Sequence, residues 1–160
     1  EKQAANAIFD SDTYRPVFEQ DLREAVETVV ISSPTLSRKR VENLVELLLP
    51  AQEHGLKAAV ITWHPDMYRY GNDENRLLLL ESLRTAGFEI HYAEDTCQHF
   101  AVIDEKIVWY GSMNLLSRDD VEDNIMRLES REVAEELLGI TATNACGGMT
   151  FNGEADDENG

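Results

Sequence analysis

The sequence has few of the features that mark membrane, secreted or metal-binding proteins. Its apolar runs, such as Leu77 to Leu80, are far shorter than the roughly 20 residues that span a bilayer. Its N-terminus lacks the apolar stretch of a signal peptide. Neither cysteine, Cys97 nor Cys146, belongs to a CxxC pair, so nothing supports a structural zinc site. We therefore expect a reduced, cytoplasmic protein that needs no metal or other cofactor and contacts no membrane.

Basic residues are also scarce. The chain has 14 Lys and Arg against 31 Asp and Glu, which gives a formal net charge of −17. A diffuse negative field repels nucleic acids and anionic membranes, which disfavours a free-standing DNA-binding protein. The exception is Arg38-Lys39-Arg40, at the start of a predicted helix. This cluster is either a contact for nucleic-acid phosphates or an ordinary solvated helix face.

The length of 160 residues suits a single globular domain, and 42% hydrophobic residues are enough to build its core. The composition changes near the C-terminus, where Gly, Asn and acidic residues replace the apolar pattern. We expect a folded domain over residues 1–140. Residues 141–160 are predicted to form an acidic, disordered tail.

The hydrophobic pattern predicts an α/β fold. Apolar residues recur at helical spacing in three segments, 14–27, 37–53 and 73–86. Short apolar runs alternate with them, at 28–34, 56–63 and 88–92. This order favours parallel strands with helices packed on the sheet. Two β-rich segments, 98–103 and 106–110, then predict an antiparallel hairpin, and a strand at 124–129 and a helix at 131–138 follow. The expected architecture is a mixed sheet flanked by helices, in which β-α-β order precedes a β-hairpin.

The most specific pattern lies between residues 97 and 129. Asp104 is followed, after six residues, by Gly111-Ser112 and then Asn114. This spacing resembles the signature of the phospholipase D superfamily: His-x-Lys, four residues, Asp, six residues, then Gly-Ser/Gly-x-Asn. Asp123 lies near the place where that family has a further carboxylate.

Two stretches resemble a narrower subgroup, the phospholipase D-like domains at the C-terminus of bacterial DNA/RNA helicases. They are residues 106–117, Lys-Ile-Val-Trp-Tyr-Gly-Ser-x-Asn-Leu-Leu-Ser, and residues 125–128, Ile-Met-Arg-Leu. The resemblance implies a module of a larger helicase-type protein, which could meet nucleic acid through that parent protein.

The first two motif positions depart from the family. There the His attacks phosphorus, the Lys neutralises the phosphate, Ser and Asn bind its oxygens, and Asp orients the charged groups. Here Cys97 replaces the His and His99 replaces the Lys. A neutral imidazole supplies no charge, and a thiol needs a nearby base or cation to become a nucleophile.

Three hypotheses follow from this departure. The preferred one is a catalytically degenerate domain that serves in dimerisation or in positioning phosphate or nucleic acid. The alternative is an active, metal-independent phosphodiesterase or nuclease in which Cys97 is the nucleophile and His99 its partner. A third is a module that binds a phosphate-like anion without turnover. Lipid hydrolysis is the least expected activity, because the sequence has no apolar interfacial segment.

The resemblance also implies an assembly. The family's active site uses two facing motifs, whereas this chain contains one. We therefore expect a homodimer in which the two sites face each other. Ser33 lies near the end of the first predicted strand and His64 follows the second, and open α/β sheets bind ligands at such strand ends. Together with Gly111 they are predicted to contact substrate, although each could be an ordinary loop residue.

Overall fold

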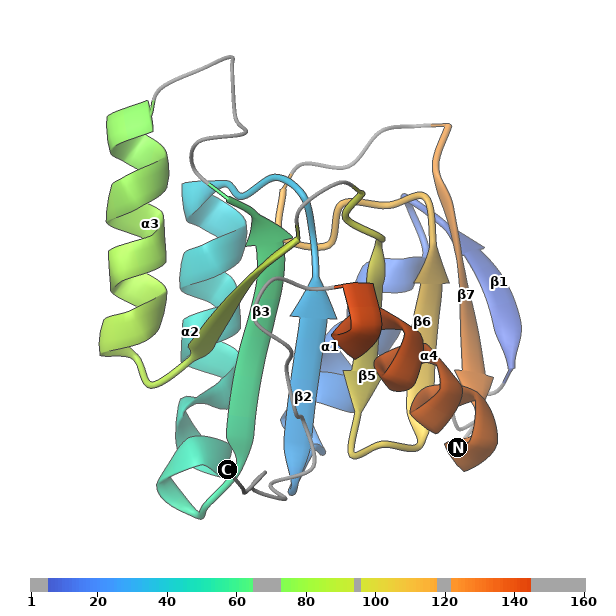
Figure 1. Ribbon diagram of the computed structural model, residues 1–160. Helices are drawn as coiled ribbons and strands as arrows, with labels where there is room; N and C mark the ends of the chain where they lie inside the picture. Colours follow the sequence, from blue (N-terminus) through green and yellow to red (C-terminus); the bar gives the residue numbers. More distant parts are fainter. Residues whose placement is uncertain (1–5, 65–72, 94–95, 118–121, 145–160) are drawn as a thin grey trace.

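The computed structural model of the chain is built around one mixed sheet (Figure 1). The structure describes residues 6–64, 73–93, 96–117 and 122–144. The strands are β1 (Ala7–Asp10), β2 (Thr28–Ser32), β3 (Lys57–Trp63), β4 (Glu89–Ala93), β5 (Phe100–Ile103), β6 (Ile107–Gly111) and β7 (Asn124–Glu129). The helices are α1 (Tyr14–Arg23), α2 (Arg38–Glu53), α3 (Asp73–Thr85) and α4 (Arg131–Asn144). The sheet order is β1-β7-β6-β5-β2-β3-β4.

The sheet has a parallel part and an antiparallel part. Strands β2, β3 and β4 pair in parallel, as the alternation of apolar runs and helices predicted. Strand β5 runs antiparallel to β2 and forms the predicted hairpin with β6. In its turn, Asp104 and Glu105 adopt φ values of 54° and 55°. Strand β7 pairs with β6 and β1, again antiparallel. The predicted mixed α/β fold is confirmed.

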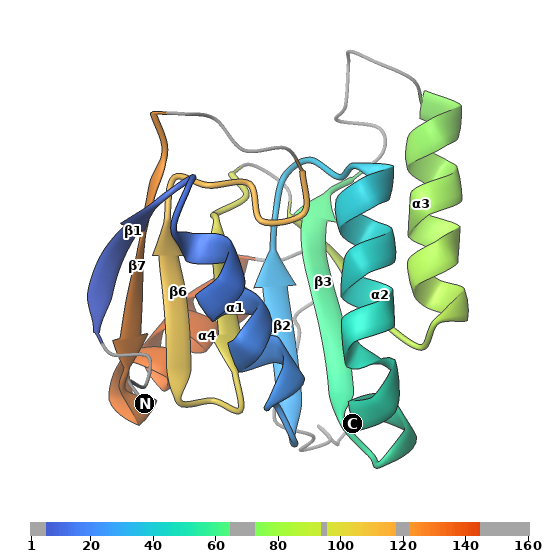
Figure 2. The same ribbon diagram turned by 180° about the vertical axis from the view of Figure 1, so that it is seen from behind.

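Both faces of the sheet are covered, but by different helices. Helices α1, α2 and α3 lie on one face, and α4 crosses the other (Figures 1 and 2). The alternation of side chains along β2 matches this division. Val29 and Ile31 pack in the cluster under α1 and α2, whereas Val30 packs in the cluster with α4. Among the residues that the structure describes, no helix has the length and apolar character of a membrane span.

Three main features differ from the sequence-based expectations. Helix α1 ends at Arg23 rather than at residue 27, because the backbone N–H groups of residues 26–28 bind the Asp104 carboxylate. Strand β1 was not predicted. Helix α4 continues to Asn144, past the expected domain boundary at 140. The remainder of the expected tail, 145–160, lies outside the described residues.

Strand direction brings distant segments to one edge of the sheet, which we call the motif edge. Strands β2, β3, β4 and β6 end there, and β5 and β7 begin there. The three helices α1, α2 and α3 also start at this edge (Figure 2). The segments around residues 32–34, 97–99, 111–117 and 122–124 therefore converge, although they are far apart in the sequence.

Candidate functional site

The structure brings His99 to the turn that follows β6. The Nδ1 atom of His99 lies 3.0 Å from the carbonyl oxygen of Met113. A carbonyl only accepts hydrogen bonds, so Nδ1 carries the proton of this bond. In the neutral ring, Nε2 then holds the lone pair. The backbone N–H of Gly111 also donates to the His99 carbonyl, at 3.3 Å. The motif positions before β5 and after β6 are thus in direct contact.

Cys97 has different partners. Its side chain is 8% exposed, and its Sγ atom lies 3.6 Å from Ser32 Oγ and 3.8 Å from the carbonyl oxygen of Ile61. Burial raises the pKa of the thiol, and this outweighs the opposing effects of the Ser32 hydroxyl and the Arg76 charge. The thiol is therefore protonated at neutral pH, an environment that disfavours a thiolate nucleophile.

The space beside the thiol is also small. The adjoining cavity has a volume of about 20 Å³ and is lined by residues that include Thr96, Gln98 and Thr141 of α4. A volume of this size accommodates roughly one water molecule. A phosphodiester, with its phosphorus and four oxygens, does not fit against Cys97 in this conformation.

Gly111 and Ser112 hold β6 against the start of β7. A Cβ atom on Gly111 would lie 2.6 Å from Ile125 Cα and would overlap the carbonyl oxygen of Asn124, so glycine is needed for this close approach. Ser112 Oγ accepts a hydrogen bond from the Asn124 backbone N–H at 3.1 Å, and the Ser112 N–H donates to the Asn124 carbonyl at 2.9 Å. Gly111, predicted to bind substrate, is thus explained by packing, while Ser112 remains exposed.

Asn114 presents a buried polar atom, Oδ1, that has no hydrogen-bond partner among the described residues. Buried polar atoms are seldom left unpaired, so this atom is a candidate for a hydrogen bond with a ligand or a water molecule. The two ends of an amide side chain can exchange by a flip, which would present the NH₂ donors at the same position. Asn114 is therefore suited to hydrogen-bond an oxyanion beside His99.

Ser33 and His64, both predicted to contact substrate, make different contacts within the fold. Ser33 is fully buried, and its hydroxyl donates to the Thr35 carbonyl at 2.9 Å and accepts from the Leu116 N–H at 3.3 Å. Ser33 thereby joins the end of β2 to the loop that follows β6. His64 packs against Tyr92 of the edge strand β4, with ring centroids 4.8 Å apart. Strand β3, which His64 follows, is three strand spacings from β6, about 14 Å.

The two predicted carboxylates lie at opposite edges. Asp123 immediately precedes β7 and so lies at the motif edge. Asp104 follows β5 and lies at the far edge, about 17 Å from His99 for five extended residues. Its carboxylate accepts hydrogen bonds from the backbone N–H groups of residues 26, 27 and 28, at 2.7–3.1 Å. The carboxylate thus joins the hairpin to the segment before β2, whereas the resemblance implied that Asp104 orients the charged groups of the site.

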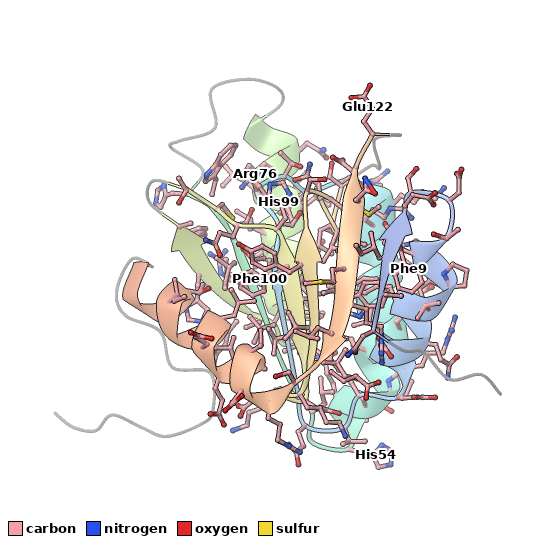
Figure 3. All side chains as sticks on the ribbon, turned by 90° about the vertical axis from the view of Figure 1, so that its right-hand side faces the viewer. Phe9, His54, Arg76, His99, Phe100 and Glu122 are labelled. Atoms are coloured by element: carbon pink, nitrogen blue, oxygen red, sulfur yellow. The ribbon has the colours of Figure 1, made fainter. Side chains whose placement is uncertain are left out.

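Sequence reasoning missed Arg76, which is 5% exposed. Its Nη2 atom donates to the carbonyl oxygens of Pro34 and Trp63, at 3.2 and 2.7 Å, and to Thr62 Oγ1 at 2.8 Å. It thereby ties α3 to the ends of β2 and β3. Figure 3 shows Arg76 and His99 at the same end of the sheet. No local sequence signal could have revealed this, because the contact depends on how α3 packs.

No cluster that could hold a metal ion occurs within the ranges that the structure describes. The site assembled there consists of His99, the exposed Ser112 hydroxyl, Asn114 and, one residue before β7, Asp123. It offers hydrogen-bonding groups for an oxyanion, and it contains a neutral buried thiol where the motif has its nucleophile.

Comparison with known proteins identifies the family. Residues 18–140 match the family described as "Cardiolipin synthase, PLD-like domain", and the chain belongs to this phospholipase D-like family. A search of curated protein sequences finds no match.

Solved structures show the same fold. The phospholipase D family member Nuc from Salmonella typhimurium aligns with a TM-score of 0.68 at 11% identity, over 89% of this chain and 96% of that one. NucT from Helicobacter pylori aligns with a TM-score of 0.68 at 14% identity, over 89% and 98%. The archaeal chromatin protein TrmBL2, whose structure shows a mode of DNA binding, aligns at 0.58 and 13%, over 86% and 51%.

Proposed function

We propose that this chain is a catalytically degenerate phospholipase D-like domain that binds and positions a phosphodiester, as the dimeric module of a larger helicase-type protein. The observation that carries the proposal is the chemistry at the first two motif positions. The thiol of Cys97 is buried and protonated, and the imidazole of His99 is bonded to a backbone carbonyl.

Hydrolysis of a phosphodiester needs more than these groups supply. The phosphate is an anion, so attack requires an activated nucleophile and positive charge around the oxygens. Cys97 lacks activation, and His99 replaces a permanently charged lysine with an imidazole. Binding requires less, because Ser112 and Asn114 can hydrogen-bond phosphate oxygens without promoting attack. When protonated, His99 can donate from Nε2 and keep its bond to Met113, which adds a charge-assisted contact.

The test is hydrolysis of bis(p-nitrophenyl) phosphate and of single-stranded DNA in EDTA. We expect no turnover by the wild-type chain. We expect it to bind the single-stranded DNA, and we expect Ser112→Ala and Asn114→Ala to weaken that binding. The double substitution Cys97→His/His99→Lys restores both motif residues and is the positive arm. Turnover by the wild type that disappears in Cys97→Ala would refute degeneracy and establish the thiol as a nucleophile. If neither Ser112→Ala nor Asn114→Ala weakens DNA binding, the positioning role is refuted.

An exposed apolar row supports the homodimer. Tyr110, Met126 and Ile8 are cross-strand neighbours on β6, β7 and β1, and they are 41%, 40% and 72% exposed. They share the sheet face of α4, which leaves this row uncovered. Tyr110 adjoins Gly111, so the row reaches the motif edge. A second copy seated there would remove the row from water and bring its own motif edge close to the first.

The oligomeric state can be measured by sedimentation. We expect a dimer for the wild type and a monomer for Met126→Lys/Ile8→Lys. The matched control is Leu77→Lys/Leu78→Lys on α3, where two leucines that are 52% and 66% exposed lie outside the row. A wild-type chain that stays monomeric at every concentration, or a control that dissociates equally well, would contradict the proposed interface.

A further inference from the structure

We propose that the groove between the first turns of α1 and α2 binds the phosphate backbone of a single-stranded nucleic acid that passes over the motif edge. This inference rests on the proposed phosphodiester-binding function and adds a second surface to it. The groove has a volume of about 470 Å³. Its walls carry four cations, Arg15 from α1 and Arg38, Lys39 and Arg40 from α2.

Arg15 is held in place before any ligand arrives. Its guanidinium lies over the rings of Tyr14 and Phe18, 5.5 and 5.8 Å from their centroids. Its Nη1 atom is 3.4 Å from the Tyr14 hydroxyl, and its Nε atom is 3.3 Å from a carboxylate oxygen of Glu19. A guanidinium fixed in this way loses little conformational entropy when it binds a phosphate. Arg15 is therefore a pre-organised part of the groove.

The three cations of α2 occupy an unfavourable place. Ser37 caps the helix by accepting a hydrogen bond from the Arg40 N–H at 3.3 Å, and the first turn contains no acidic residue. The N-terminal end of a helix dipole is positive, so cations there cost stability, whereas Glu or Asp would add to it. A chain with 31 acidic residues nevertheless has three consecutive cations at this position. These cations repel one another and the positive end of the helix dipole, and a polyanion bound in the groove offsets that repulsion.

The groove is continuous with the motif edge. The backbone N–H of Ser37 donates to the Leu116 carbonyl at 2.8 Å, and Arg40 Nε donates to the Ser117 carbonyl at 3.3 Å. Residues 115–117 directly follow Asn114. Figure 2 shows this loop reaching from the end of β6 to the start of α2. A strand bound at Ser112 and Asn114 can thus extend along the loop into the groove.

The mixed character of the groove favours a nucleic acid over an acidic peptide. Glu42 and Glu46 lie among the cations, and Asn43 Nδ2 is bonded to Glu19 at 2.9 Å across the floor. Carboxylates repel a polyglutamate but accept hydrogen bonds from the amino groups of bases. Unpaired bases present those groups freely, and a single strand is narrow enough to enter a groove between two helices.

The experiment compares two charge reversals of equal size. Arg38→Glu/Lys39→Glu changes the groove, and Lys57→Glu/Lys106→Glu changes two exposed lysines at the opposite edge of the sheet. Binding of a labelled single-stranded oligonucleotide of about 12 nucleotides is followed by fluorescence anisotropy over a range of salt concentrations. Thermal melting accompanies each titration. The groove reversal should change the melting temperature little, because the gain from glutamates at a helix N-terminus offsets the loss of the exposed Arg38–Glu42 ion pair.

We expect the groove reversal to weaken binding about tenfold or more and to flatten the salt dependence, and the control to weaken it about twofold or less. Equal losses for both reversals would overturn the inference, because they would report net charge alone. An unchanged affinity in the groove reversal, with binding still sensitive to Ser112→Ala, would overturn the groove and leave the proposed function intact. If polyglutamate competes as effectively as unlabelled oligonucleotide, the inference of a nucleic-acid ligand is overturned. The groove would then fit an acidic protein partner.

Discussion

Asp104 is the motif residue whose role the structure changes most, and its removal gives a quantitative test. Its buried carboxylate receives three backbone N–H groups, from Val26, Glu27 and Thr28. Hydrogen bonds to charged groups contribute about 1.5–3 kcal/mol each, but losses within one cluster are not additive. We expect Asp104→Ala to lower the free energy of unfolding by about 3–5 kcal/mol. Asp104→Asn keeps an acceptor and tolerates the positive φ, so about half that loss is expected.

Glu105 provides the matched control for this prediction. It follows Asp104 in the same turn with nearly the same left-handed φ, 55° against 54°. Glu105→Ala keeps an ordinary L-residue at this left-handed φ, so it changes the backbone strain little and leaves the buried carboxylate in place. Urea unfolding followed by circular dichroism gives the two free energies. If the two alanine variants differ by less than about 1 kcal/mol, the structural role of Asp104 is refuted.

Oligonucleotide binding separates the structural role from a catalytic or binding one. Under conditions in which Asp104→Asn is fully folded, its affinity should equal that of the wild type, because the carboxylate lies at the edge opposite His99. Weaker binding by fully folded Asp104→Asn would contradict this placement.

Three further outcomes are expected. Gly111→Ala should lower the free energy of unfolding by about 2 kcal/mol or more in denaturant titrations, since its methyl group meets the backbone of β7. Arg127→Met should cost about 3–5 kcal/mol in the same assay, because it leaves the carboxylate of Asp21 buried without its 2.7 Å ion pair. In a Cys146→Ala background, alkylation of Cys97 should be slow at neutral pH and reach half its maximal rate above the ordinary thiol pKa. A midpoint at or below that value would contradict the raised pKa.

The sequence alone determined the order of the elements. Helices α2 and α3 and strand β7 lie within one residue of their predicted limits, because their apolar spacing and end residues are local signals. The hairpin of β5 and β6 followed from two β-rich segments around a short polar turn. The motif spacing likewise identified the family without any knowledge of the fold.

Tertiary structure decided the rest. Strand β1 has four residues, three of them exposed, and exists because β7 offers it a partner. Four residues separate His99 from Asp104 in the motif, and they become a strand that carries the two side chains to opposite edges. The burial of Cys97 depends on Ser32 and Ile61, which are distant in the sequence. Spacing along a chain reports which residues are near in sequence, whereas pairing and packing between distant segments decide which side chains meet.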